Sequence, residues 1–360
     1  MNEILKRLKK VFDSAKGIDE IMLVNSESGD PNFFYLTGFT SGVFEGNVLI
    51  AKRDRIYLFT NPLEYHTALQ QKFDGLEIIN GQDAHLLRER IKRLIEGKVV
   101  GTDGTNLPMA AYLSIKKRYA PKKIVDISDA FGNARAIKDA GEISTIRRAV
   151  AITKRAMVEI ESSFKEGITE SGLAAKFDYI AGSLGASGMG FKTIVAFGKN
   201  SALPHHFPDS TRLRAGDFIL IDAGAKVGNY GADMTRTFIF KESKAKNLGL
   251  MKDMIDTVKK AQLKAIEAMK AKKDGMYVHN AAEEYIDSAA GGRYKGKFIH
   301  SLGHSIGLET HDGIVISKRT RQKLREGMVL TAEPGIYING FGGVRIEDDV
   351  LITKNGAVVL

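Results

Sequence analysis

The chain has 360 residues, a formal net charge of +10 and no cysteine. This length predicts two domains, and 43% hydrophobic with 27% charged residues is typical of a globular protein. The lack of cysteine excludes disulfides, thiolate nucleophiles and zinc ribbons. No apolar run approaches the roughly 20 residues that cross a bilayer, so we expect no membrane partner.

The positive charge alone does not specify a partner. A basic protein can bind nucleic acid, but that function needs a basic patch or a motif. Here Lys and Arg are scattered, and runs such as Lys116-Lys117-Arg118 lie at expected helix ends. We therefore expect solvated helix faces and no nucleic-acid partner. Residues 1–16 predict an amphipathic helix rather than a signal peptide, and hence a cytoplasmic protein.

Up to about residue 130, strand signals alternate with helix signals. Short apolar runs predict strands at Glu20–Asn25, 46–62 (two strands), 76–80, 98–104 and 123–129. Periodic stretches predict helices between them, near 84–96 and 107–119. This alternation is the pattern of an α/β domain.

A domain boundary is expected near Gly132, which divides the chain into residues 1–132 and 133–360. The segment 131–142 has a loop-like composition. Asp139, with a glutamate three residues later, predicts the start of a long helix through a capping box.

The second part of the chain combines long helices with strands of a largely antiparallel sheet. Helices are expected from Asp139 to about Lys165, from Thr169 onward, and over 246–272 and 277–290. Strands are expected within 191–198, 217–224, 235–240, 328–338 and 344–353. This segregation is typical of an α+β domain.

Acidic side chains interrupt several of these apolar strands, at Asp222, Asp233, Glu333 and Glu347. A single acid there is more often a turn cap, and Glu347 could pair with Arg345. Buried carboxylates need a cation, because an isolated buried charge is very costly. Four carboxylates with a histidine suit Mn, Co, Fe or Zn. Their charge balances two divalent ions with a water or hydroxide between them.

Histidines gather in two short segments rich in Gly, Pro and Ser. Five of the eight are His205, His206, His300, His304 and His311. Each alone is more often structural, but catalytic groups frequently occupy loops held by a rigid frame.

Five segments resemble the pita-bread metallopeptidases, which include prolidases, Xaa-Pro aminopeptidases, methionine aminopeptidases and creatinase. They occur in the family's order: NSALPHH (Asn200–His206), 221–238, 300–312, TAEPGIY (331–337) and GGVRIEDD (342–349). The resemblance implies an α+β pita-bread catalytic domain. NFFYLTGF (Asn32–Phe39) resembles the α/β creatinase-like N-terminal domain. Methionine aminopeptidases usually lack that domain, which favours the proline-specific branch.

The resemblance implies a dinuclear metal site. Asp233 and Glu347 would bridge both ions, Asp222 would bind one, and His304 with Glu333 would bind the other. Glu333 would also be the general base for the metal-bridged water or hydroxide that attacks the substrate.

The resemblance also implies residues that contact substrate. His205 would lie near the scissile bond, and His311 would stabilise the oxyanion or hold the substrate. Arg345 would orient the Glu347 ligand or anchor the substrate. His300 would line the pocket, and Phe191 would supply an apolar wall.

Two positions depart from the family's pattern. Short prolidases often read His-Glu-x-Pro-Arg where this chain reads His311-Asp312-Gly313-Ile314-Val315. The missing arginine is a candidate anchor for a dipeptide's carboxylate. Phe197 replaces a usual serine.

The leading prediction is a prolidase that cleaves the Xaa-Pro bond of dipeptides. The alternatives are an Xaa-Pro aminopeptidase acting on longer peptides, a methionine aminopeptidase, and a non-catalytic binding protein on the same fold. The complete ligand set disfavours the last. The resemblance also implies a homodimer, in which a loop within residues 30–45 would reach the partner's site.

Overall fold

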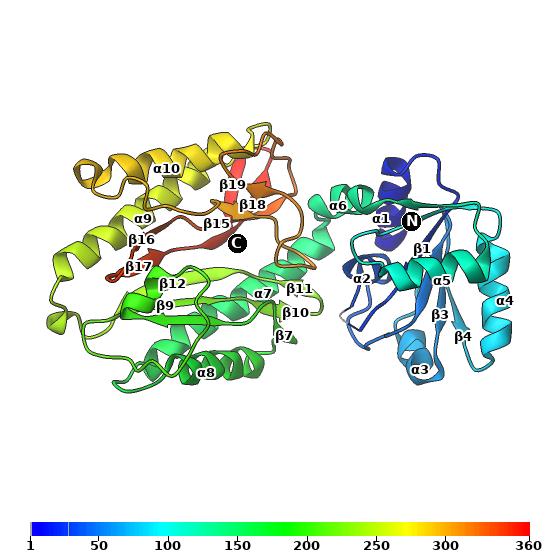
Figure 1. Cartoon of the computed structure of the whole chain (residues 1–360), viewed down its shortest axis with the longest axis horizontal. Coiled ribbons are helices and arrows are strands. Elements are labelled where there is room, and N and C mark those ends of the chain that lie inside the picture. The colour runs from blue at the N-terminus through cyan, green and yellow to red at the C-terminus, as the bar shows by residue number, and fades with distance from the viewer. Residues whose placement is uncertain (1, 28) are drawn as a thin grey trace. The chain divides into compact units, whose positions relative to one another are not determined.

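The computed structural model describes residues 2–27 and 29–360, which form two compact units that divide between Arg135 and Ala136 (Figure 1). The first unit is built on one six-stranded mixed sheet, in the order β4-β3-β2-β1-β5-β6. Its strands are β1 (Glu20–Val24), β2 (Val48–Ala51), β3 (Ile56–Thr60), β4 (Leu76–Asn80), β5 (Val99–Thr102) and β6 (Lys123–Asp126). Each lies where an apolar run predicted a strand.

Helices connect and cover this sheet. They are α1 (Glu3–Ser14), α2 (Pro31–Thr37), α3 (Pro62–Gln70), α4 (Ala84–Ile95), α5 (Met109–Tyr119) and α6 (Ser128–Ala136). The helices α2 and α3 were missed because they are short. Each begins with proline after a capping residue, since Asp30 accepts a hydrogen bond from Asn32 N and Asn61 accepts one from Glu64 N. The expected loop 30–45 therefore contains a helix.

The prediction of a loop over 131–142 was wrong, because α6 covers its first part. Ser128 N donates a hydrogen bond to Asp126 Oδ1 at 2.9 Å, just before the helix turns. Phe131 and Ala134 are buried. The small and polar residues of this segment are typical of a loop. The packing of its buried side chains against the rest of the protein stabilises a helix instead.

Four long helices belong to the second unit: α7 (Ala140–Glu159), α8 (Glu170–Ser183), α9 (Leu248–Ala268) and α10 (Gly275–Gly292). The capping box at Asp139 and the start of α8 after Thr169 were predicted correctly. Helix α7 ends earlier than expected, in a 3₁₀ turn over Ile160–Ser163. Residues 289–291 break α10 before its end.

The strands of this unit form several small sheets. The first joins β12 (Met234–Ile239), β9 (Phe218–Ala223) and β8 (Ile194–Phe197), all antiparallel. Short pairings add β7 (Gly188–Met189), β10 (Ala225–Val227) and β11 (Tyr230–Gly231), and also β13 (Gly303–His304) with β14 (Val315–Ile316). Helices α7 and α8 lie on one side of these strands and α9 and α10 on the other (Figure 1).

Near the C-terminus, both predicted long strands are broken. The first gives β15 (Val329–Ala332) and β16 (Gly335–Ile338), and the second gives β17 (Gly342–Arg345) and β18 (Asp348–Thr353). A last strand, β19 (Gly356–Val359), pairs with β18. Because β15 pairs with β18 and β16 with β17, the two breaks face each other. The breaks contain Glu333 and Glu347.

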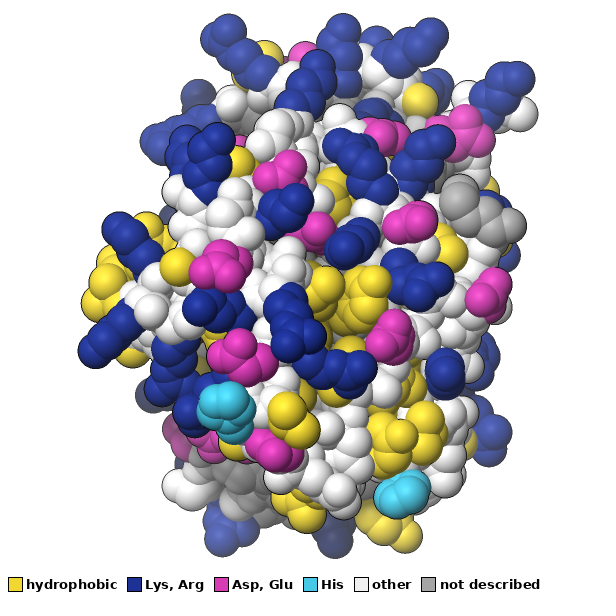
Figure 2. Space-filling view, turned by 90° about the vertical axis from the view of Figure 1, so that its right-hand side faces the viewer, with side chains coloured by type: hydrophobic (Ala, Val, Ile, Leu, Met, Phe, Trp, Pro, Cys, Tyr) yellow, Lys and Arg dark blue, Asp and Glu magenta, His cyan; other side chains and the backbone are white. Residues whose placement is uncertain are grey.

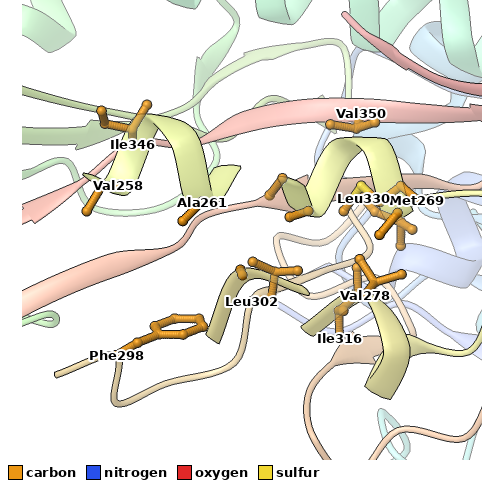
Figure 3. Close-up of a cluster of buried hydrophobic side chains, with 14 of the residues drawn as sticks. Val258, Ala261, Met269, Val278, Phe298, Leu302, Ile316, Leu330, Ile346 and Val350 are labelled. Carbon is orange, nitrogen blue, oxygen red and sulfur yellow. The ribbon is translucent and has the colours of Figure 1, made fainter. Parts of the chain in front are cut away.

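A large apolar core holds these broken strands (Figure 3). Val258 and Ala261 of α9 and Val278 of α10 share one buried cluster with Leu330 of β15 and Val350 of β18. Burying a side chain of this size contributes about 1.5–3 kcal/mol. The core holds the apolar faces of these strands in place. It therefore also fixes the positions of the strand breaks that contain Glu333 and Glu347.

A second core joins α7 and α8 to the β8–β9–β12 sheet. Ile146, Phe177 and Ile221 are fully buried in it, together with Phe197. Phe197, one of the two departures noted in the sequence, is thus a core side chain.

On the face shown in Figure 2, Lys and Arg side chains are spread out, with Asp and Glu between them. This is the scattered pattern that the sequence predicted. No helix among the described residues combines the length and apolarity needed to span a bilayer.

Candidate active site

One cavity of about 360 Å³ in the second unit brings together every residue that the sequence singled out as a site residue. The ten residues are Phe191, His205, Asp222, Asp233, His300, His304, His311, Glu333, Arg345 and Glu347. The structure therefore places all of them in one site.

Local structure explains why the four carboxylates meet. Asp222 lies near the end of β9 and Asp233 directly precedes β12, and these antiparallel strands pair Asp222 with Thr235. Glu333 and Glu347 occupy the facing strand breaks, where no regular ladder dictates the direction of a side chain.

A metal-sized grouping lies at the centre. Ligand atoms of Asp233, His304 and Glu347 all lie within 4.8 Å of one another. His304 Nε2 is 3.7 Å from Asp233 Oδ2 and 3.6 Å from Glu333 Oε1. Asp222 offers a further oxygen, since its buried Oδ1 has no hydrogen-bond partner among the described residues.

The electrostatics of this cluster call for a cation. Burial, and then repulsion from Glu347, raises the pKa of Asp233 and of Glu333 well above the ordinary carboxyl values. Burial, and then the charge of Asp222, raises the pKa of Glu347 to about 8. Only Arg345 lends a fixed positive charge among the residues that line the cavity. Divalent ions supply the missing charge, so the donor set fits them.

The tautomer and the protonation state of His304 suit a metal ligand. Its Nδ1 lies 3.2 Å from the carbonyl oxygen of Ser305, which can only accept, so Nδ1 carries the hydrogen. The lone pair of Nε2 then faces the carboxylates. Burial, and then the neighbouring His311, lowers the pKa of His304 to about 4, so the ring is neutral near pH 7.

Sequence reasoning missed the residues that hold the carboxylates. Thr235 Oγ1 donates a hydrogen bond to Glu347 Oε2 at 2.6 Å. Asp349 Oδ2 accepts one from the backbone N–H of Asp233 at 3.0 Å. A signal existed for Thr235, because it lies in an expected strand two residues after Asp233, a spacing at which side chains of extended backbone share a face.

The rest of the cavity has a polar and an apolar part. His300 Nδ1 donates to the carbonyl oxygen of Ser301, and its Nε2 accepts from Tyr337 OH at 2.8 Å. The His304 and His311 ring centroids are 4.2 Å apart. Phe191 and Val315 provide apolar lining.

Asp312, one of the residues that depart from the pattern expected from the sequence resemblance, is not among the residues that line the cavity. Its Oδ2 lies 3.4 Å from Lys138 Nζ, and both side chains are buried. Val315, four residues after His311, lines the cavity at the position where the sequence resemblance led us to look for an arginine.

Residues 144–354 match the model of metallopeptidase family M24, and residues 5–137 match the creatinase/prolidase N-terminal domain. The chain belongs to metallopeptidase family M24. It is therefore a metal-dependent hydrolase with the predicted creatinase-like and pita-bread domains. The predicted family and fold class are confirmed.

Curated relatives of this M24 protein extend over both units. It is 34% identical over 357 residues to proteins named Xaa-Pro dipeptidase from Pyrococcus horikoshii and from Pyrococcus furiosus. The alignments cover 99% of this chain and 96% or 97% of the relatives.

Solved structures show the same extent of similarity. The X-Pro aminopeptidase from Thermotoga maritima has a TM-score of 0.87 and 32% identity, covering 95% of each chain. The prolidase from Pyrococcus horikoshii has a TM-score of 0.86 and 32% identity, covering 99% of this chain and 97% of the other.

Proposed function

We propose that this M24 protein is an Xaa-Pro dipeptidase, which hydrolyses the bond before proline in dipeptides. The observation that carries the proposal is the buried, cation-deficient carboxylate cluster in a cavity of about 360 Å³. The full-length similarity to proteins named Xaa-Pro dipeptidase supports this substrate.

Asp222, Asp233, His304, Glu333 and Glu347 would hold two divalent ions, which would be Mn, Co, Fe or Zn. Asp233 and Glu347 would bridge the pair. When bound, such ions lower the pKa of water and polarise a carbonyl group. The neutral His304 and the cluster's excess negative charge support this assignment.

Glu333 is our candidate for the general base. Its side chain lines the cavity, and its Oε1 lies 3.6 Å from His304 Nε2, so it would be close to a water held by the ions. It would accept a proton from the attacking water and pass it to the proline nitrogen. That nitrogen has no hydrogen in an Xaa-Pro amide, so it must gain one before the bond breaks.

Histidines would complete the substrate site. His205 would contact the substrate near the scissile bond, and His311 would donate a hydrogen bond to the oxygen that becomes negative. His300 would line the pocket beside the substrate, with Phe191 and Val315 as walls for the pyrrolidine ring.

Arg345 would act mainly by orienting ligands. Its Nη2 donates to Asp222 Oδ2, and its Nε donates to Thr235 Oγ1, which in turn holds Glu347. This supports the predicted alignment of Glu347, through Thr235 rather than by direct contact.

A homodimer remains part of the proposal. Val43 and Leu63 are exposed apolar side chains of the first unit. Backbone N–H groups at Val43 and Phe44 donate to Glu64, which brings these side chains to one surface region. The native metal and the cytoplasmic location stay predictions.

A second candidate is an Xaa-Pro aminopeptidase that acts on longer peptides. Two observations favour it: the similarity to the Thermotoga maritima X-Pro aminopeptidase, and Val315 in place of a carboxylate-binding arginine.

Amino-acid release by purified protein, stripped of metal and reloaded with Mn²⁺ or Co²⁺, tests these functions. Met-Pro, Leu-Pro, Met-Ala and Met-Pro-Gly-Gly are offered side by side. Metal-dependent release from Met-Pro and Leu-Pro only would support the dipeptidase. Release from the longer peptide as well would favour the aminopeptidase. Release from Met-Ala alone would show that the protein is not specific for proline. No release with any metal would reject both.

A further inference from the structure

Glu170 is a buried carboxylate that the proposed chemistry does not use. It is the first residue of α8, with Thr169 as the N-cap, and its side chain is fully buried. A carboxylate at the start of a helix gains from the helix dipole, but full burial still demands donors for both oxygens.

One oxygen of Glu170 holds the start of the segment 197–209. Oε1 accepts from the backbone N–H of Phe197 at 2.7 Å and from Asn200 Nδ2 at 3.0 Å. Phe197 is the last residue of β8, and Asn200 lies in the 3₁₀ turn η2 (Gly198–Ala202).

The other oxygen holds the end of the same segment. Oε2 accepts from His206 Nε2 at 2.7 Å and from the backbone N–H of Asp209 at 3.2 Å. A single carboxylate therefore bridges two points of the loop that are twelve residues apart.

His205 lies between these attachment points. It lines the cavity and is exposed, and in the described part of the chain its side chain makes no hydrogen bond. Its neighbour His206 is drawn to Glu170 instead. The hydrogen bond between the His206 ring and Glu170 thus fixes the backbone at 205–206. The ring of His205 takes no part in this bond and can contact a ligand.

We propose that Glu170 and His206 form a positioning pair that presents His205 to the substrate. The inference rests on the proposed function, because it takes His205 as a substrate contact. A charge-assisted bond to a desolvated carboxylate is stronger than a neutral one, so the pair suits a loop that carries an otherwise unsupported catalytic side chain.

A double-mutant cycle tests the inference in the full-length, Mn²⁺-loaded protein with Leu-Pro as substrate. Glu170→Gln keeps the shape but loses the charge and one acceptor oxygen. We expect kcat/KM to fall about 10-fold in Glu170→Gln and about 100-fold in His205→Ala. Manganese content should be unchanged in both. In the His205→Ala background, Glu170→Gln should cause no further fall, because residues that act as a unit are not additive.

Two control variants separate this role from general effects. Glu166→Gln removes one negative charge from the surface just before α8, where Glu166 pairs with Lys241. Tyr294→Phe removes a partly buried hydrogen bond to Asp253 in the same unit, which involves no residue of the segment 197–209. Both should keep kcat/KM, although Tyr294→Phe should lower the melting temperature.

A readout without catalysis makes the test independent of the substrate. Ring signals of His205 in metal-free, histidine-labelled protein, assigned by their loss in His205→Ala, should shift in Glu170→Gln and stay in place in Tyr294→Phe. Unshifted signals in Glu170→Gln would overturn the proposal whatever the activity. So would multiplicative losses in the cycle, or manganese loss in Glu170→Gln. Full activity of His205→Ala would show that His205 is not a substrate contact, and the positioning role would then be refuted. Cleavage of Leu-Pro by the wild-type protein would still support the proposed reaction.

Discussion

Arg345 Nη2 donates a hydrogen bond to Asp222 Oδ2 at 2.6 Å, and both side chains are buried. The same guanidinium reaches Thr235 Oγ1 at 3.0 Å and Tyr337 OH at 3.0 Å. One cation thus orients Asp222 directly and Glu347 through Thr235. Bidentate or forked geometry of this kind is what arginine offers and lysine does not.

Replacing Arg345 by Met should therefore destabilise the metal-free protein most. Breaking a buried pair leaves an uncompensated charge on Asp222, which costs about 3–5 kcal/mol. Bound metal compensates that charge, so the loss should be smaller in the Mn²⁺-loaded protein. Urea unfolding of both forms, with and without Mn²⁺, measures the difference.

An exposed arginine provides the control for that experiment. Arg155 pairs with Glu159 at 2.8 Å on the surface of α7, and Arg155→Met should cost about 0.5 kcal/mol or less with or without metal. If Arg345→Met lowers the free energy of unfolding equally with and without Mn²⁺, the ions do not compensate the negative charge of Asp222, and the prediction is wrong.

Glu333→Gln should separate metal binding from turnover. The amide oxygen can still ligate, so metal content should stay close to that of the wild type. The variant cannot take up a proton, so kcat should fall by about 10²–10⁴-fold. Metal analysis and Leu-Pro hydrolysis on one preparation test both points, with the exposed Glu326→Gln as the unaffected control. Near-normal turnover would refute Glu333 as the base.

The pH dependence of stability should change sign with metal. Burial, and then the charge of Asp222, raises the pKa of Glu347 to about 8 in the metal-free fold, against about 4.5 for the free side chain. Between these values the native state binds more protons than the unfolded state, so stability falls as pH rises. Bound ions need deprotonated ligands, so loaded protein should instead gain stability over this window.

Melting temperatures at pH 5.5 and pH 8, in chelator and in Mn²⁺, check that prediction. The metal-free protein should be the more stable at pH 5.5, and Glu347→Gln should flatten its profile. A metal-free protein that is more stable at pH 8 would show that the cluster's carboxylates do not carry the raised pKa values.

The site could be predicted from the sequence because its residues lie in short apolar segments that end at turns. Asp222 lies near the end of a buried strand. The proline after Glu333 cannot donate to a ladder, so a strand break there was foreseeable. Long-range partners left no such signal. Glu170 and His206 are 36 residues apart in the sequence, and the sequence separation of Lys138 and Asp312 is larger still. Such pairs follow from packing, which a local pattern does not encode.

A last prediction concerns Glu20, in the central strand β1 of the first unit. Its side chain is 6% exposed, and its buried Oε2 has no hydrogen-bond partner among the described residues. Burial raises the pKa of Glu20 to about 7, although Lys52 and Lys98 oppose the shift. A raised pKa in the fold means that stability falls as pH rises from about 4.5 to 7 and stays low above that.

Glu20→Gln removes this ionisation and should stabilise the first unit by about 1–2 kcal/mol at pH 8. At pH 5 the native carboxyl is already protonated, so the gain should nearly vanish. Hydrogen exchange of the β1 amides reports on this unit without interference from the metal site. Glu77→Gln, on β4 with a half-exposed side chain paired to Arg55, should change little at either pH. A gain of equal size at pH 5 and pH 8 would mean that Gln packs better for reasons unrelated to charge.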